Sequence, residues 1–105
     1  MSYEEALSAL DDPTRRLLLE RLTGGPRPAG ELAAGLPISR PAVSQHLRVL
    51  REANLVSEQR DGTRRIYRLN PNGLRELRAY FDGFWQRALD DFQHAADHDE
   101  NGQQP

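Results

Sequence analysis

The chain has 105 residues, enough for one small domain and too few for two ordinary ones. It contains no cysteine, which excludes disulfides, thiolate catalysis and cysteine metal sites, and it has neither a long apolar run nor a signal-peptide pattern, so we expect a cytoplasmic protein without a membrane partner. The net charge of −2 is unevenly spread: residues 39–69 hold seven arginines against three acids, and such a basic segment with acidic flanks is expected where one face of a domain meets a polyanion.

Three short helices are predicted in the first third of the chain. Residues 3–10 form one candidate, and Asp12 and Pro13 then supply an N-cap and a first-turn proline for the next. This second helix should bury Leu18, Leu19 and Leu22. A third helix is expected from Pro28 to about Gly35, with Leu32 and Leu36 buried.

Residues 39–53 predict an amphipathic helix with a marked start. Ser39 can cap its first turn, where Pro41 is tolerated, and we expect Asn54 to end it in the left-handed region. The predicted buried stripe is Val43, Leu47 and Leu50. A second face without acids carries Arg40, Ser44, Gln45 and Arg48. These side chains can donate to phosphates or base edges, which fits a recognition helix, although an ordinary solvated helix would show the same pattern.

The residues before and after this stretch favour the recognition helix. A short helix and a tight turn precede it, which together make a helix-turn-helix. After it, residues 56–60 and 63–69 predict two strands joined by Asp61-Gly62, a type I′ hairpin signal that would place Glu58 opposite Arg65. The hairpin tip carries Arg60, Thr63, Arg64 and Arg65. A basic hairpin directly after a helix-turn-helix is interpreted as a wing; the alternative is a solvated hairpin with ordinary surface arginines.

The longest predicted helix covers about residues 71–96. Its apolar residues recur in nearly heptad steps, and Gly83 suggests a close contact or a slight bend. A helix of that length exceeds the diameter of so small a domain, so part of its stripe should pack on a second copy. The predicted dimer interface consists of Leu7, Leu77, Phe81, Phe84, Trp85, Ala88 and Phe92. We expect one domain over residues 1–96 and a polar, disordered tail over 97–105.

The chain resembles the ArsR/SmtB family of bacterial winged-helix repressors over about residues 4–96. The resemblance is carried by three segments in order, ALSALDDPTRRLLLERL, GELAAGLPISRPAVSQHLRVLREANLV and RDGTRRIYRLNP. It implies a mainly α fold with a small β-hairpin (α-α-α-α-β-β-α), a homodimer through the first and last helices, and a recognition helix in the major groove of double-stranded DNA. It places base contacts on Ser44, Gln45 and His46 and phosphate contacts on Arg40, Arg48, Arg64 and Arg65. With the cap and the wing tip added, the predicted DNA site also includes Ser39, Arg60 and Thr63.

The chain departs from the metal-sensing members of that family. Where they often carry two cysteines, this chain has Pro28 and Gly30, neither of which binds metal through a side chain. His94 and His98 stand at i and i+4 near acids, which is ligand-capable spacing, but a solvated acidic helix end is the simpler interpretation. We therefore expect no metal and no cofactor.

The sequence predicts a DNA-binding transcriptional regulator, most simply a repressor that binds a palindromic operator as a homodimer. The alternative is a winged-helix protein–protein interaction module that uses the aromatic C-terminal helix. An enzyme is not expected, because Ser44 and His46 point to different faces of their helix and no third orienting group is identifiable. The sequence does not identify a small-molecule inducer.

Overall fold

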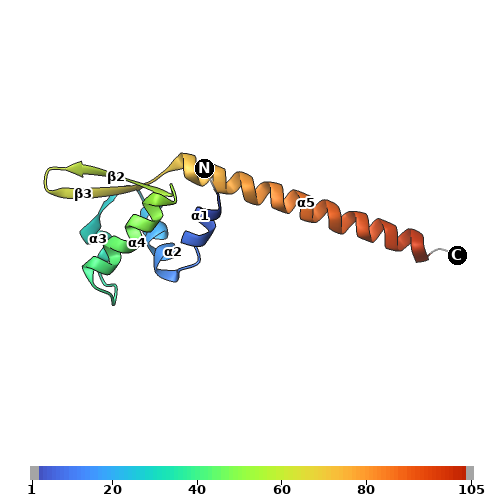
Figure 1. The fold of residues 1–105 in the computed structure, drawn as a ribbon, viewed down its shortest axis with the longest axis horizontal. Helices are drawn as coiled ribbons and strands as arrows, with labels where there is room; N and C mark the ends of the chain where they lie inside the picture. Colours follow the sequence, from blue (N-terminus) through green and yellow to red (C-terminus); the bar gives the residue numbers. More distant parts are fainter. Residues whose placement is uncertain (1–2, 104–105) are drawn as a thin grey trace.

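A computed structural model describes residues 3–103, and the side chains of residues 3–97. The first four helices lie together on one side of a small sheet, and the last helix projects away from them (Figure 1). In chain order the elements are α1 (Tyr3–Ala9), α2 (Pro13–Leu22), β1 (Arg27–Pro28), α3 (Ala29–Ala33), α4 (Arg40–Glu52), β2 (Val56–Asp61), β3 (Arg64–Leu69) and α5 (Pro71–Gln103). This order confirms the predicted mainly α fold with a β-hairpin between the fourth helix and the last.

The predicted caps of α2 and α4 are confirmed. The Asp12 carboxylate accepts hydrogen bonds from the backbone N–H groups of Thr14 and Arg15, at 2.7 and 3.2 Å. The Ser39 hydroxyl accepts one from the Ala42 N–H at 3.2 Å. Both caps satisfy donors that a first helical turn leaves without an intrahelical partner. Asn54 ends α4 with a φ of 65°, the expected left-handed conformation.

The hairpin has a third strand that the sequence analysis did not predict. Arg27 and Pro28 pair antiparallel with Tyr67 and Ile66, so the strand order is β1-β3-β2. The prediction that Pro28 begins the third helix is wrong, because its ψ of 151° is extended and α3 starts only at Ala29. Proline lacks a donor N–H, and it is tolerated in β1 because that strand lies at the edge of the sheet.

The predicted register of the hairpin is also wrong, by two residues. Glu58 lies opposite Tyr67, and Asp61 pairs with Arg64, so the connecting residues are Gly62 and Thr63. Gly62 has a φ of 63° and is the only one of the two with positive φ, which fits a type II′ turn rather than the expected type I′. A slip of two residues keeps every side chain on its predicted face of the sheet, whereas a slip of one would have exchanged the faces.

The core lies between the helices and one face of the sheet. Leu18 and Leu22 of α2 and the predicted stripe of α4 are buried in it, together with Leu32 of α3 and Tyr67 of β3, and α1 contributes Ala6 and Ala9. Leu19 and Leu36 are only partly buried against this core. Because α4 is held on its apolar side by the core, its opposite face is presented outward.

Helix α5 gives the molecule its elongated shape. Its 33 residues make a rod of about 50 Å, and the radius of gyration of 19.5 Å exceeds the about 13 Å expected for a compact domain of this length. The helix continues to Gln103, beyond the predicted end near residue 96, and residues 104–105 lie outside the described part. The proposed division into a domain and a tail stays a prediction. Among the described residues, no helix has the length and apolar character needed to span a bilayer.

Candidate nucleic-acid interface

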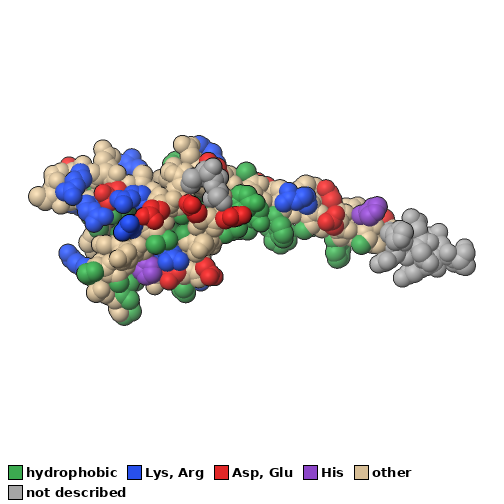
Figure 2. Space-filling model, in the orientation of Figure 1, with side chains coloured by type: hydrophobic (Ala, Val, Ile, Leu, Met, Phe, Trp, Pro, Cys, Tyr) green, Lys and Arg blue, Asp and Glu red, His purple; other side chains and the backbone are tan. Residues whose placement is uncertain are grey.

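The outward face of α4 carries the residues predicted to read DNA. Arg40, Gln45 and Arg48 are exposed, and Ser44 is partly buried at the edge of the same face. Arginine side chains gather over α4 and the hairpin in the view of Figure 2, whereas apolar side chains follow the lower side of α5. The two kinds of surface therefore lie on different parts of the molecule.

A groove separates the start of α4 from the wing, the hairpin formed by β2 and β3. One hollow of about 190 Å³ lies between α3, α4 and β3 and is lined by Arg40, Ser44 and Arg65. A second, of about 350 Å³, continues from it toward the wing tip and adds Thr63 and Arg64 to the lining. We call these two hollows the α4–wing groove. It brings together predicted DNA contacts from segments about twenty residues apart in the chain.

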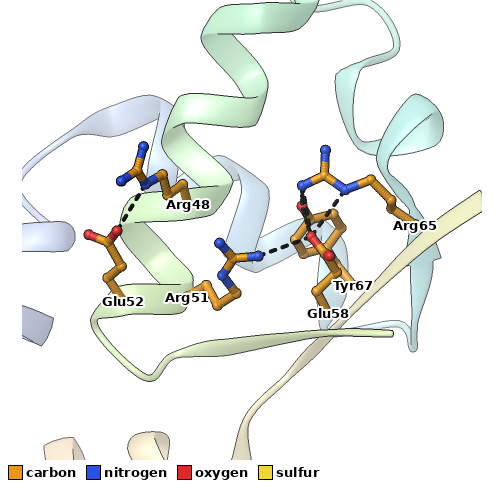
Figure 3. Close-up of polar contacts among 6 residues, drawn as sticks. All are labelled: Arg48, Arg51, Glu52, Glu58, Arg65 and Tyr67. Carbon is orange, nitrogen blue, oxygen red and sulfur yellow. Dashed lines mark hydrogen bonds and ion pairs between the residues drawn. The ribbon is translucent and has the colours of Figure 1, made fainter. Parts of the chain in front are cut away.

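Arg65 is anchored by a cluster that the sequence analysis predicted only in part. Its Nε and Nη2 atoms donate to one carboxylate oxygen of Glu58, at 3.1 and 2.7 Å. The same oxygen accepts a bond from the Tyr67 hydroxyl at 2.7 Å and one from Arg51 of α4 at 3.2 Å. Figure 3 shows the four side chains converging, with the remaining guanidinium nitrogen of Arg65 pointing away from Glu58. The Glu58 cluster thus ties the wing to α4.

The cluster shifts the ionisation of its members in the directions that stabilise it. The hydrogen bond from Tyr67, followed by the bonds from Arg65, lowers the pKa of Glu58 below its ordinary value. Burial, and then the hydrogen bond to Glu58, raises the pKa of Tyr67 to about 12. At neutral pH the cluster therefore contains a carboxylate, a neutral phenol and two guanidinium groups.

Two predictions about individual arginines need correction. Arg65 was expected at the wing tip as a phosphate contact. It does stand near the turn, opposite Arg60, but it is partly buried and two of its nitrogens are held by Glu58, so its phosphate contact stays a prediction. The face of α4 was expected to lack acids, yet Arg48 forms an ion pair with Glu52 one turn later, at 2.9 Å (Figure 3). Arg51 was missed entirely; its position in the last turn of a helix that precedes an acid-containing strand was the only signal.

His46 of the recognition helix α4 faces the start of α2. It is partly buried, and its Nδ1 atom is 3.4 Å from an Arg15 nitrogen. Arg15 also donates to the Ala9 carbonyl oxygen at 2.6 Å, so one guanidinium joins α1, α2 and α4. The two contacts favour a structural role for His46 over the base contact that the resemblance implied, and its DNA contact stays a prediction.

The predicted dimer surface of α5 is exposed over its outer part. Phe81, Phe84 and Phe92 are 38, 44 and 76% exposed, and Trp85 is 58% exposed. Leu89, also exposed, was missed although it stands four residues after Trp85, at helical spacing. Figure 2 shows this apolar surface along the projecting helix.

Two other members of the predicted dimer surface, Leu77 and Leu7, pack within their own domain. Leu77 is 9% exposed and lies in the core, so little of its surface is left for a partner, and its place in the interface stays a prediction. Leu7 and Ala88 are partly buried, and α1 packs on α5 with the Tyr3 and Tyr80 rings stacked at 4.0 Å between centroids.

His94 and His98 are the two candidate metal ligands of the sequence, and only the first has a described side chain. Among the residues with described side chains, no three histidines, cysteines or acids come together in a way that could hold an ion. His94 is exposed, and the side chain of His98 lies outside the described residues.

Comparisons with known proteins agree with this arrangement. A family model described as a helix-turn-helix domain matches residues 10–59. The HTH-type transcriptional regulator Rv2034 of Mycobacterium tuberculosis is 57% identical over 88 residues, which cover 84% of this chain and 82% of that protein. The transcriptional repressor SdpR of Bacillus subtilis is 41% identical over 68 residues, 65% of this chain and 76% of its own length.

Solved structures give the same picture. The crystal structure of a "Possible transcriptional regulator for arsenical resistance" matches with a TM-score of 0.70 and 50% identity, over 81% of this chain and 93% of that one. That of an ArsR family transcriptional regulator matches with a TM-score of 0.75 and 26% identity, over 84% and 94% of the two chains.

Proposed function

Because the chain belongs to the ArsR family of winged helix-turn-helix transcriptional regulators, we propose that it binds a palindromic operator as a homodimer and represses transcription from it. The chain is a DNA-binding transcriptional regulator. The proposal of operator binding as a homodimer is supported by the presence of two separate surfaces. One is the α4–wing groove with its exposed arginines, and the other is the exposed apolar stripe on α5.

The reading residues of the proposed complex are Ser44 and Gln45. Gln45 is exposed on the face of α4 opposite the buried stripe, so it can enter a major groove without disturbing the core. A glutamine side chain can pair with the N6/N7 edge of adenine through two hydrogen bonds, which gives sequence discrimination. Ser44 lies beside it at the mouth of the groove.

Phosphate contacts come from the rim of the same surface. Arg40 lies at the start of α4, and Arg60 and Arg64 are exposed in the wing. Two nitrogens of Arg65 are used on Glu58 within the wing, so Arg65 offers only its remaining nitrogen to the groove. Three arginines from each of two copies give six phosphate contacts, for which log K should fall against log salt with a slope of about −5.

Dimerisation through α5 would place two copies of α4 at successive major grooves. Exposure of large apolar side chains such as Trp85 and Phe92 to water is unfavourable. The same stripe on a second copy of the chain can cover them, and this requires no other partner. A two-fold axis between recognition helices requires half-sites about 34 Å apart, which is one turn of DNA, and hence a palindromic operator.

The test compares Gln45→Ala with Arg64→Ala on a panel of operator variants at several salt concentrations. Loss of Gln45 should cost about 1–3 kcal/mol at one base position in each half-site. Loss of Arg64 should weaken binding to all sequences alike and reduce the salt slope by about 2, since one contact disappears from each copy.

Arg87→Ala is the matched control, because Arg87 is exposed on α5 and lies outside the proposed DNA surface. It removes the same charge and should change neither base preference nor slope. If Gln45→Ala leaves base preference unchanged everywhere, the reading face is assigned wrongly. If the wild-type chain binds no duplex better than random DNA, the proposal fails and the protein-interaction alternative takes its place.

A further inference from the structure

The end of α4 and the start of α5 meet in an unusually close backbone contact. A Cβ atom added to Gly73 would lie 1.7 Å from the carbonyl oxygen of Asn54 and 2.6 Å from its carbonyl carbon. Both are backbone atoms, so no flexible side chain can move aside. Only glycine allows α5 to approach the chain at Asn54 this closely. Gly83, where the sequence suggested a close contact, would meet only the flexible end of Arg87, at 3.3 Å.

The backbone at Asn54 is itself fixed by the way α4 ends. Asn54 has a φ of 65°, and its N–H donates to the Arg51 carbonyl oxygen at 2.9 Å. The next N–H, from Leu55, donates to the Leu50 carbonyl oxygen at 3.0 Å. This pair of bonds is the Schellman motif, which closes a helix with one left-handed residue. The carbonyl that faces Gly73 therefore belongs to the rigid end of the recognition helix.

Asn70 bonds the same two elements together. Its side-chain nitrogen donates to the Asn54 side-chain oxygen at 2.8 Å, and its backbone N–H donates to the Leu55 carbonyl oxygen at 2.9 Å. Its side-chain oxygen accepts from the Asn72 N–H at 3.1 Å and so caps α5. One residue thus starts the last helix and ties it to the end of α4.

We propose that this joint, formed by Asn54, Asn70 and Gly73, sets the position of the recognition helix relative to α5 and thereby determines the half-site spacing that the dimer accepts. The inference rests on the proposed function, since α5 carries the dimer surface and α4 the reading face. In a dimer joined through α5, a displacement at the joint moves both recognition helices, and the two-fold axis doubles its effect on their separation. The joint residues are positioning residues, and DNA does not need to touch them.

Gly73→Ala is the direct test. Contacts of an added Cβ below 3.0 Å are essentially never seen, so the separation at this point must grow from 1.7 Å by more than 1 Å. The probes are a palindromic duplex selected from random DNA with the wild-type protein, versions with one base pair added or removed between half-sites, and a duplex with a single half-site. We expect the variant to remain dimeric by light scattering, to bind the selected duplex at least tenfold more weakly, and to lose or shift its spacing preference. Binding to the single half-site should stay within about twofold.

Gly83→Ala is the matched control: it makes the same substitution in the same helix at a site with space and should behave as wild type. Asn70→Asp is a second test, and it does not require the fold to accommodate an added Cβ atom at Gly73. It keeps a capping oxygen for Asn72 but replaces the donor to Asn54 with a carboxylate, and it should also reduce discrimination between spacings. Wild-type spacing preference and affinity in both Gly73→Ala and Asn70→Asp would overturn the inference. If Gly73→Ala does not fold, Asn70→Asp alone decides it. A wild-type protein without specific palindrome binding would overturn the proposed function first, and this inference with it.

Discussion

Replacing Glu58 with glutamine should loosen the wing from the recognition helix. Glutamine has the shape of glutamate, but its neutral oxygen accepts less strongly and its amide nitrogen accepts nothing. One Glu58 oxygen receives four hydrogen bonds, three of them from the guanidinium groups of Arg51 and Arg65 and one from Tyr67. The carboxylate is only 18% exposed, so water replaces these bonds incompletely.

The expected loss is about 2 kcal/mol of unfolding free energy. A hydrogen bond to a charged group contributes about 1.5–3 kcal/mol and a neutral one about 0.5–1.5 kcal/mol, and part of the set survives with glutamine. Urea denaturation at fixed protein concentration measures the difference. The matched control is Glu52→Gln, which removes the same charge from an arginine pair whose side chains are 65 and 61% exposed. That pair should contribute no more than about 0.5 kcal/mol. Equal losses in the two variants would refute the anchoring role of Glu58.

The pH dependence gives an independent check of the same cluster. The Tyr67 hydroxyl and then Arg65 lower the pKa of Glu58 in the folded protein below its ordinary value of 4.5. The unfolded chain therefore takes up the proton first as the pH falls. The stability difference between the wild type and Glu58→Gln should be constant from pH 7 to about 5 and shrink below pH 4.5. A difference that persists unchanged at pH 3 would show that the charge of Glu58 contributes nothing.

Two further predictions concern α5. Phe84→Asp or Phe92→Asp should convert the dimer to a monomer, as measured by light scattering at tens of micromolar, and should weaken DNA binding at the same time. The control Gln86→Asp, at an exposed polar site on the same helix, should change neither property. A wild-type monomer at that concentration would contradict the dimer. Calorimetry with Zn²⁺ should show only weak binding and no release of DNA, and stoichiometric tight binding that His94→Ala abolishes would overturn that expectation.

Local patterns sufficed for the elements whose signals lie within a few residues. Asp12 and Ser39 were identified as caps because capping needs only the next three residues, and Val43, Leu47 and Leu50 were identified as core from helical spacing. The hairpin register failed because Asp-Gly and Gly-Thr both make acceptable two-residue turns. Strand β1 was missed because two residues that include a proline carry no strand signal of their own and become a strand only by pairing with β3.

The residues whose surroundings the sequence did not show act between elements rather than within one. In the sequence, Gly73 is only a residue of low helix propensity near the start of a helix. The close approach of the Asn54 backbone, at the end of α4, shows why a side chain is excluded there. Leu77 belongs to the same periodic stripe as Phe84, and periodicity cannot tell which part of a long helix its own domain covers. A stripe longer than its domain predicts a partner, but the boundary between core and interface is a property of the packed structure.

Arg65 shows most clearly how the structure changes the interpretation of a basic wing. An arginine near a hairpin tip suggests a phosphate contact, yet two of its nitrogens are used on Glu58, one of which also contacts the Tyr67 hydroxyl. The planar fork of a guanidinium can make these bonds and still direct a third nitrogen elsewhere, whereas the single ammonium of lysine cannot span the same geometry. The tie between the wing and α4 runs through Glu58, which Arg65 bonds from within the wing and Arg51 bonds from α4. We therefore propose Arg60 and Arg64, whose side chains are exposed, as the DNA contacts of the wing.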